Sequence, residues 1–148
     1  MQELPVAPST ALAVGGPHVD GPYATTGRLV VAPVQPRRTE MVVRVQGEVD
    51  LATAPRLEAV LEQAVVAMAA EDRVDASPQG AVPRVVCDLD GVTFLCAAGL
   101  TVLQRVTALA ASRHVDWVVL ARTRPARRVV ELTGMDRVVP LRTTPAAR

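Results

Sequence analysis

The 148-residue sequence contains no lysine and only three aromatic residues, although hydrophobic residues make up 49% of it. A core in this chain must therefore be built from Val, Leu and Ala. All 16 basic residues are arginines, and this skew, together with the abundance of Ala, Val, Gly and Pro, indicates a GC-rich coding sequence more than a physical need. The length suits one ordinary domain and is too short for two.

Long apolar runs are absent as well. No stretch approaches the roughly 20 apolar residues that span a bilayer, and the amino terminus lacks the basic and apolar regions of a secretory signal. We therefore expect a cytoplasmic protein without membrane insertion. The formal net charge of +1 gives no general attraction to nucleic acid, so we expect no nucleic-acid partner.

The motifs of common enzymes are also missing. Neither a phosphate-binding glycine loop nor a serine on a sharp strand-to-helix turn occurs. The two cysteines, Cys87 and Cys96, do not form a CxxC pair, so we expect no metal and no cofactor. Cys96 stands just before a predicted helix, where the helix dipole favours a thiolate. We interpret it as a small apolar filler, with a reactive thiol as the alternative, and expect no catalytic residue and no enzyme activity.

The chain divides into one domain and two tails. Residues 1–27 are rich in Pro, Gly, Ser and Thr and show no periodic pattern, which predicts a disordered amino-terminal tail. The domain is predicted over 28–143, with a mobile surface loop at 70–83 and a frayed carboxyl-terminal tail at 144–148.

Hydrophobic patterns within the domain predict strands that alternate with helices. Apolar residues recur at spacings of three and four from Leu57 to Met68 and form one stripe along a helix. Pro33 favours an edge position for the first strand, and Asp90 with Gly91 predicts a turn. The predicted strands are 29–34, 41–46, 84–89, 115–121 and 137–141, and the predicted helices are 57–68, 100–113 and 125–133.

This order, ββαβαβαβ, predicts an α/β fold. Strands that alternate with helices favour right-handed crossovers and a largely parallel sheet, here begun by an antiparallel hairpin. We therefore expect a single domain with a mixed, mostly parallel sheet of four or five strands and helices packed on it.

Three segments, in this order along the chain, resemble the STAS domains of bacterial anti-sigma-factor antagonists. Residues 47–55 (GEVDLATAP) are similar to the family's strand-to-helix signature. Residues 86–95 (VCDLDGVTFL) are similar to its central strand and the turn after it, and residues 124–135 to its third helix, which ends in a small residue and Gly. The resemblance covers residues 28–143 and implies a STAS-like fold with a role in partner switching and transcription regulation.

One departure from the family pattern affects the expected function. After the central strand the family usually reads Asp-Ser-Ser-Gly-Leu, and the first Ser accepts a phosphate. Here residues 96–100 read CAAGL, so the matching position is Ala97, which has no hydroxyl. The resemblance therefore implies a protein that cannot be phosphorylated at this position, with Thr93 and Thr101 as the neighbouring hydroxyls that could act as displaced acceptors.

The resemblance also implies a partner, an anti-sigma factor of the histidine-kinase-like ATPase type, whose sigma factor is released when this chain docks. Glu48 and Asp50 also fit a turn-forming pair without a contact role. The alternative is a STAS accessory subunit or ligand-sensing module outside a sigma cascade, for example of a lipid-transport ATPase, and the oligomeric state is open. The residues expected at the partner interface are Glu48, Asp50, Thr53, Thr93, Cys96, Ala97, Ala98, Gly99, Leu100 and Thr101.

Overall fold

A computed structural model describes residues 29–74 and 81–144 of the chain. Its elements follow the predicted order ββαβαβαβ, with a short 3₁₀ helix before the last strand. The predicted tail at 1–27, residues 75–80 of the predicted loop and residues 145–148 lie outside the described part. The elements are β1 (Val30–Arg37), β2 (Glu40–Val49), α2 (Ala54–Val74), β3 (Arg84–Leu95), α3 (Ala97–Ser112), β4 (Asp116–Leu120), α4 (Arg124–Leu132), η1 (Met135–Arg137) and β5 (Leu141–Arg142).

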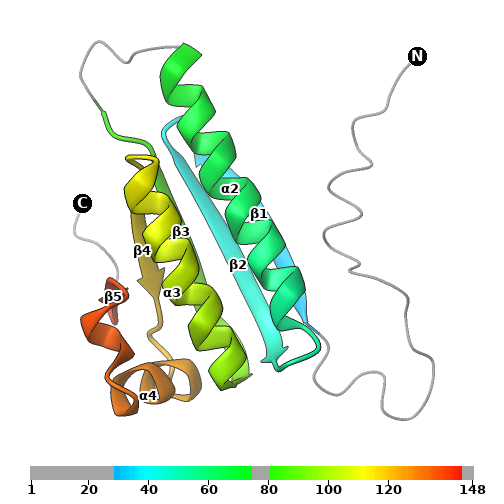
Figure 1. The fold of residues 1–148 in the computed structure, drawn as a ribbon. Helices are drawn as coiled ribbons and strands as arrows, with labels where there is room; N and C mark the ends of the chain where they lie inside the picture. Colours follow the sequence, from blue (N-terminus) through cyan, green and yellow to red (C-terminus); the bar gives the residue numbers. More distant parts are fainter. Residues whose placement is uncertain (1–28, 75–80, 145–148) are drawn as a thin grey trace, which may run out of the picture.

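The five strands form one sheet in the order β1-β2-β3-β4-β5. β1 pairs antiparallel with β2, and the other three pairs are parallel, which confirms the predicted mixed, mostly parallel α/β sheet (Figure 1). Pro33 and Pro36 lie in β1, an edge strand, where a residue without an N–H is tolerated because one side of the strand has no ladder to supply.

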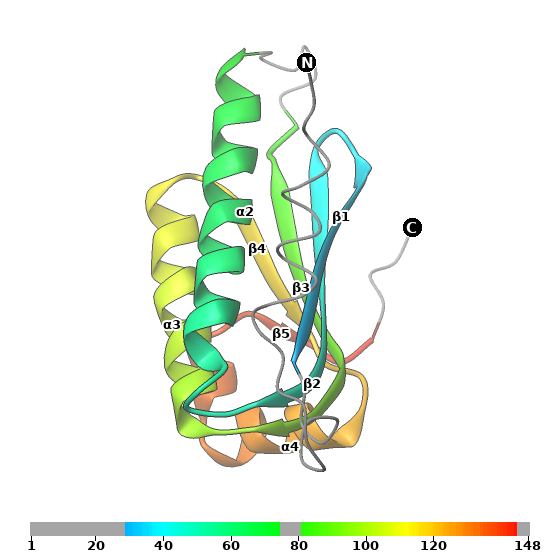
Figure 2. The same cartoon turned by 90° about the vertical axis from the view of Figure 1, so that its right-hand side faces the viewer.

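The core lies between the sheet and two helices. Figure 2 shows α2 and α3 side by side on the same face of the sheet, and α4 at the end where β3 and β4 finish. Along β2, the start of β3 and β4, the odd-numbered residues are buried toward the helices, because successive side chains of a strand point to opposite faces. The largest side chains of this core that are fully buried include Leu57, Leu61, Met68, Leu89 and Leu103.

Several predicted boundaries differ from the structure, among them those of α2 and of the last strand. α2 continues to Val74, although a loop was predicted from residue 70, because the charged run there also contains the strong helix formers Ala, Glu and Arg. The predicted strand at 137–141 is wrong over most of its length, since η1 ends at Arg137 and β5 begins at Leu141. Pro140 lacks the N–H that a strand would need at that place.

Gly134 closes α4. It follows the helix in the left-handed conformation, with φ of 75°, which a residue without a Cβ adopts at little cost. Its N–H donates to the carbonyl of Glu131 at 3.1 Å.

α3 lies very close to the ends of β2 and β3 at Gly99. A Cβ on this residue would lie 2.5 Å from Cδ1 of Leu95 and 2.8 Å from Cγ1 of Val49. The Leu95 side chain is flexible, but the β-branched Val49 has little rotamer freedom to move away. The glycine therefore sets how closely the helix packs on the sheet.

Replacing Gly99 with Ala should destabilise the fold by about 1–2 kcal/mol. Overpacking costs roughly 1–3 kcal/mol, and the gain in helix propensity recovers at most about 1 kcal/mol of it. The free energy of unfolding in urea measures the effect. Val49→Ala should cost less in the Gly99→Ala background than in the wild type, because it removes the methyl group that clashes; strictly additive effects would contradict this packing account.

Candidate functional site

The candidate site is the turn that leads from β3 into α3, residues 93–101, called here the docking turn. Cys96 is the N-cap residue of α3, in extended conformation, so the helix begins at Ala97, three residues earlier than predicted. The Cys96 N–H donates to the carbonyl of Val49 at 2.9 Å, and the Cys96 carbonyl accepts the N–H of Leu100 at 3.2 Å. The end of β2 and the start of α3 are thereby held together.

The docking turn is partly exposed and partly buried. Ala97 and Thr101 are exposed, and Cys96 and Ala98 are half-buried. Gly99 and Leu100 point into the domain. Gly99 and Leu100 therefore shape the turn from inside. The other four residues, together with the exposed Thr93 and Phe94, are accessible to a partner.

Two large apolar side chains are exposed at this site: Phe94 within the docking turn, and Leu51 outside it, which was not predicted. Phe94 is 50% exposed at the end of β3, and Leu51 is 80% exposed in the loop between β2 and α2. A large apolar side chain left in water is informative when it lies beside other exposed apolar groups. The exposure of Leu51 could have been suspected from the sequence, because this apolar residue directly follows Asp50 in a strand-to-helix loop.

The loop that carries Leu51 is held by its own hydrogen bonds. The Asp50 carboxylate accepts the N–H groups of Ala52 and Thr53 at 3.0 and 2.9 Å. The Thr53 hydroxyl accepts the Asp50 N–H at 2.9 Å and lies 3.1 Å from the Glu48 carbonyl, to which it donates. Asp50 and Thr53 thus act within the loop, in the manner of an Asx turn, and leave Leu51 outermost.

The loop and the docking turn lie at the same end of the sheet. Glu48 of β2 is the register partner of Phe94 of β3, and Val49 that of Leu95. The Thr93 hydroxyl donates to the Gly47 carbonyl at 3.3 Å. Since both helices start at this end (Figures 1 and 2), the predicted contact residues of the two segments are brought together.

β3 continues without a break through Asp90 and Gly91, where a turn was predicted. The pairing with β2 is instead irregular there, with a register shift between Arg44 and Gln46. An irregularity of this kind bends a strand without ending it. The prediction failed because a bulge and a turn use the same small and polar residues.

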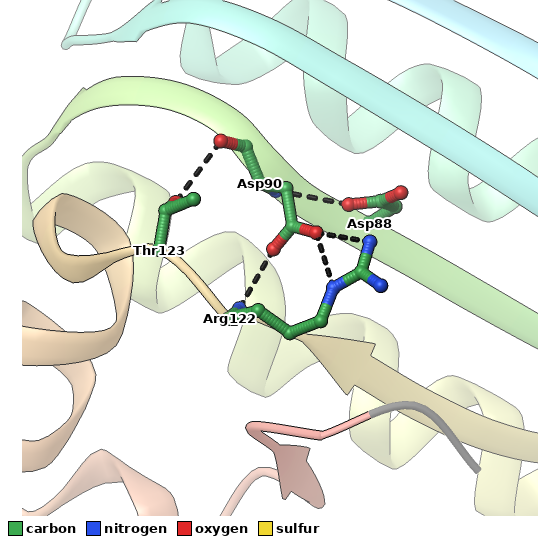
Figure 3. A network of polar contacts seen from close by, with 4 residues as sticks. All are labelled: Asp88, Asp90, Arg122 and Thr123. Carbon is green, nitrogen blue, oxygen red and sulfur yellow. Dashed lines mark hydrogen bonds and ion pairs between the residues drawn. The ribbon is translucent and has the colours of Figure 1, made fainter.

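A polar network fixes this irregular part of β3 to the connection between β4 and α4 (Figure 3). The Asp90 carboxylate accepts the Arg122 N–H at 2.7 Å and pairs with its guanidinium. The Thr123 hydroxyl donates to the Asp90 carbonyl at 3.0 Å, and the Asp90 N–H donates to Asp88 at 2.9 Å. The hydrogen bond to Asp90 raises the pKa of Arg122 above its usual value, so the guanidinium stays charged.

The two thiols have different surroundings. Burial raises the pKa of Cys87, which is fully enclosed in the core, and it stays a neutral thiol. Cys96 is half-buried at the start of α3, and its side chain makes no capping hydrogen bond. Within residues 29–74 and 81–144, no group of three or more His, Cys, Asp or Glu side chains could hold a metal ion. In the same part of the chain, no helix is long and apolar enough to cross a membrane.

Comparisons with known proteins point to one family. The model of the STAS domain matches residues 30–147. No curated protein sequence matches the chain.

Solved structures agree with the family model. An anti-sigma factor antagonist from Mycobacterium paratuberculosis is 32% identical, with a TM-score of 0.59, over 85% of this chain and 92% of its own. SpoIIAA in its unphosphorylated form is 17% identical, with a TM-score of 0.56, over 77% and 89%. The Bacillus cell fate determinant SpoIIAA in the phosphorylated form is 17% identical, with a TM-score of 0.52, over 77% and 92%.

Replacing Asp90 with Ala should destabilise the domain more than Asp116→Ala does, because it removes the acceptor of both the Arg122 N–H and its guanidinium. The Asp90 side chain is only 21% exposed. Asp116→Ala is the matched control, since its pair with Arg84 has side chains 39% and 42% exposed and should be worth less than about 1 kcal/mol. Urea unfolding measures both, and equal losses would contradict a special role for Asp90.

Proposed function

Because the chain belongs to the STAS domain family, we propose that it is an anti-sigma-factor antagonist that docks an anti-sigma factor of the kinase type and so releases a sigma factor. The relative from Mycobacterium paratuberculosis, named as such an antagonist, supports this proposal because the likeness extends over 85% of this chain. The observation that carries it is that Leu51, Phe94 and Ala97 are all exposed in segments that meet at one end of the sheet.

This surface suits a reversible protein contact. Leu51 and Phe94 offer apolar area that is exposed in the free chain, and each Å2 removed from water contributes about 25 cal/mol. The loop hydrogen bonds of Asp50 and Thr53 hold Leu51 in place before any partner arrives, so little ordering entropy is lost on docking. Glu48 and Asp50 add negative charge at the margin, which favours a basic rim on the partner.

The absence of a hydroxyl at Ala97 makes docking insensitive to a phosphate switch. A phosphate at this position would add a charge of about −1.5 to −2 to an otherwise apolar contact and repel the partner, while the start of a helix tolerates the anion. Ala97 is exposed in the first turn of α3 but offers no oxygen. The proposed antagonist is therefore constitutive: its docking turn stays uncharged whenever the chain is folded.

The hydroxyls of the neighbouring threonines, Thr93 and Thr101, are already engaged in hydrogen bonds. The Thr101 hydroxyl donates to the Ala97 carbonyl at 3.2 Å, one helical turn further along α3. The Thr93 hydroxyl donates to the Gly47 carbonyl on the neighbouring strand. Both hydroxyls are engaged with backbone, and we do not assign either as an acceptor.

Ala97→Asp and Leu51→Asp should each weaken binding to the anti-sigma kinase at least about tenfold, because each sets an unpaired charge in an apolar contact. Titration calorimetry with candidate histidine-kinase-like ATPases measures the affinity. Val82→Asp is the control. Val82 is 59% exposed and lies just before β3, at the other end of the sheet. This variant should therefore bind the partner with the affinity of the wild type. Unchanged binding by Ala97→Asp would place the interface elsewhere, and co-purification with a membrane complex would favour the accessory-subunit alternative.

Ala97→Ser should restore a phosphate switch. With the partner kinase and ATP, this variant should take up one phosphate and then lose affinity, whereas the wild type should take up none. Intact-protein and peptide mass spectrometry detect the modification and its site. Phosphate on wild-type Thr93 or Thr101 would contradict the constitutive function.

A further inference from the structure

The face of the sheet that α2 and α3 leave uncovered has its own pattern. In β2, the start of β3 and β4, the even-numbered residues point to this face, because the odd-numbered ones are buried against the helices. Among the described elements no helix lies over it (Figure 2). Val34 pairs with Val42, Val42 with Val86, and Val86 with Val118, so four valines form one apolar row across four strands.

On β2 and β3, charged residues flank this row two positions away on either side. On β2 the row is preceded by Glu40 and followed by Arg44; on β3 the order of charge is reversed, with Arg84 before and Asp88 after. The register places Glu40 beside Arg84 and Arg44 beside Asp88. On each of these two strands the valine therefore lies between opposite charges, and the sign alternates from one strand to the next.

β4 extends the valine row but has a charged residue on one side of it only. On β4, Asp116 precedes Val118 and Leu120 follows it, and Leu120 is the register partner of Arg142 on β5. The central valines and Leu120 form part of a surface hollow of about 200 Å3, with Glu40, Arg84 and Arg142 among its lining residues. The valine row is thus bordered by opposite charges on β2 and β3 and by Asp116 on β4.

We infer that this face binds a second copy of the same chain, with a twofold axis that runs along the valine row and across the strands. This rotation lays each strand over the same strand of the other copy in the opposite direction. Val86 then faces Val86, Glu40 faces Arg44 of the second copy, and Arg84 faces Asp88 of the second copy. The interface is isologous, as a closed dimer requires.

Charge complementarity selects this orientation over the other twofold arrangement. An axis along the strands would place Arg84 opposite Arg84 and Glu40 opposite Asp116, and like charges in a contact are unfavourable. Stacked sheets lie about 10 Å apart with strands within about 30° of each other, a gap that an arginine and a carboxylate can bridge. Arg84 bonds Asp116 through Nε at 2.7 Å, which leaves further guanidinium N–H groups for the second copy.

Two charge-reversal variants test the inference, because each alone should prevent dimerisation and a mixture of the two should restore it. Glu40→Arg and Arg44→Glu should each weaken self-association of the full chain about tenfold or more, because each homodimer would hold like charges at both symmetry-related contacts. In an equimolar mixture, the first variant faces the second with opposite charges at both contacts. Sedimentation velocity over a concentration series should show dimers in the wild type and in the mixture, and monomers in either variant alone.

Two further variants separate this face from other surfaces. Val86→Glu, in the middle of the row, should abolish dimers, whereas Val66→Glu, on the exposed side of α2, should not. Ala97→Asp should leave dimerisation unchanged, which separates this inference from the docking proposal. A wild type that stays monomeric at all concentrations, or a mixture no better than the single variants, would overturn the inference; such results would leave this face to another occupant, such as residues 145–148 beyond Thr144.

Discussion

The close approach of α3 to the carboxyl ends of β2 and β3 is the constraint on which the site depends. Gly99 permits it, because any Cβ there would enter the space of Val49 and Leu95. The Cys96 N–H then reaches the Val49 carbonyl, and the last residue of one strand holds the first residue of the neighbouring helix. With the buried half of the turn fixed in this way, Ala97 and Phe94 are presented outward rather than folded into the core.

The loop between β2 and α2 lies at the same end of the sheet as the docking turn but is held by a different interaction. Asp50 and Thr53 bond to each other's backbone, and Leu51 is left at the outside with 80% of its surface exposed. Asp50 has the turn-forming role that the sequence left open for it as an alternative, and together with Thr53 it holds the loop that exposes Leu51. Their own side chains are occupied within the loop, so Leu51 is the residue that a partner would meet first.

Local patterns were enough to predict the order of elements, because apolar runs bounded by turn residues indicate strands and the stripe from Leu57 to Met68 indicates a helix. They failed where residues distant in sequence decide the backbone. β3 passes through Asp90 and Gly91 because Arg122 and Thr123, 32 and 33 positions later, bind Asp90. The exposure of Phe94 likewise follows from a register shift of β3 relative to β2. This shift cannot be predicted from residues 86–95 alone. The segment 137–141 looked like a strand because Val138 and Val139 are β-branched, yet only Val139 is buried.

The two proposed surfaces of the chain are geometrically independent. The docking turn lies at the carboxyl ends of β2 and β3, whereas the valine row crosses the middle of the helix-free face. A twofold axis across the strands reverses their direction in the second copy, so a dimer built on that row carries its two docking turns at opposite ends. One compact partner cannot reach both turns, and linkage between sites strengthens binding only when both can be engaged at once. Because Ala97 cannot be charged, each turn in such a dimer would bind its own partner, at an occupancy set by partner concentration and affinity alone.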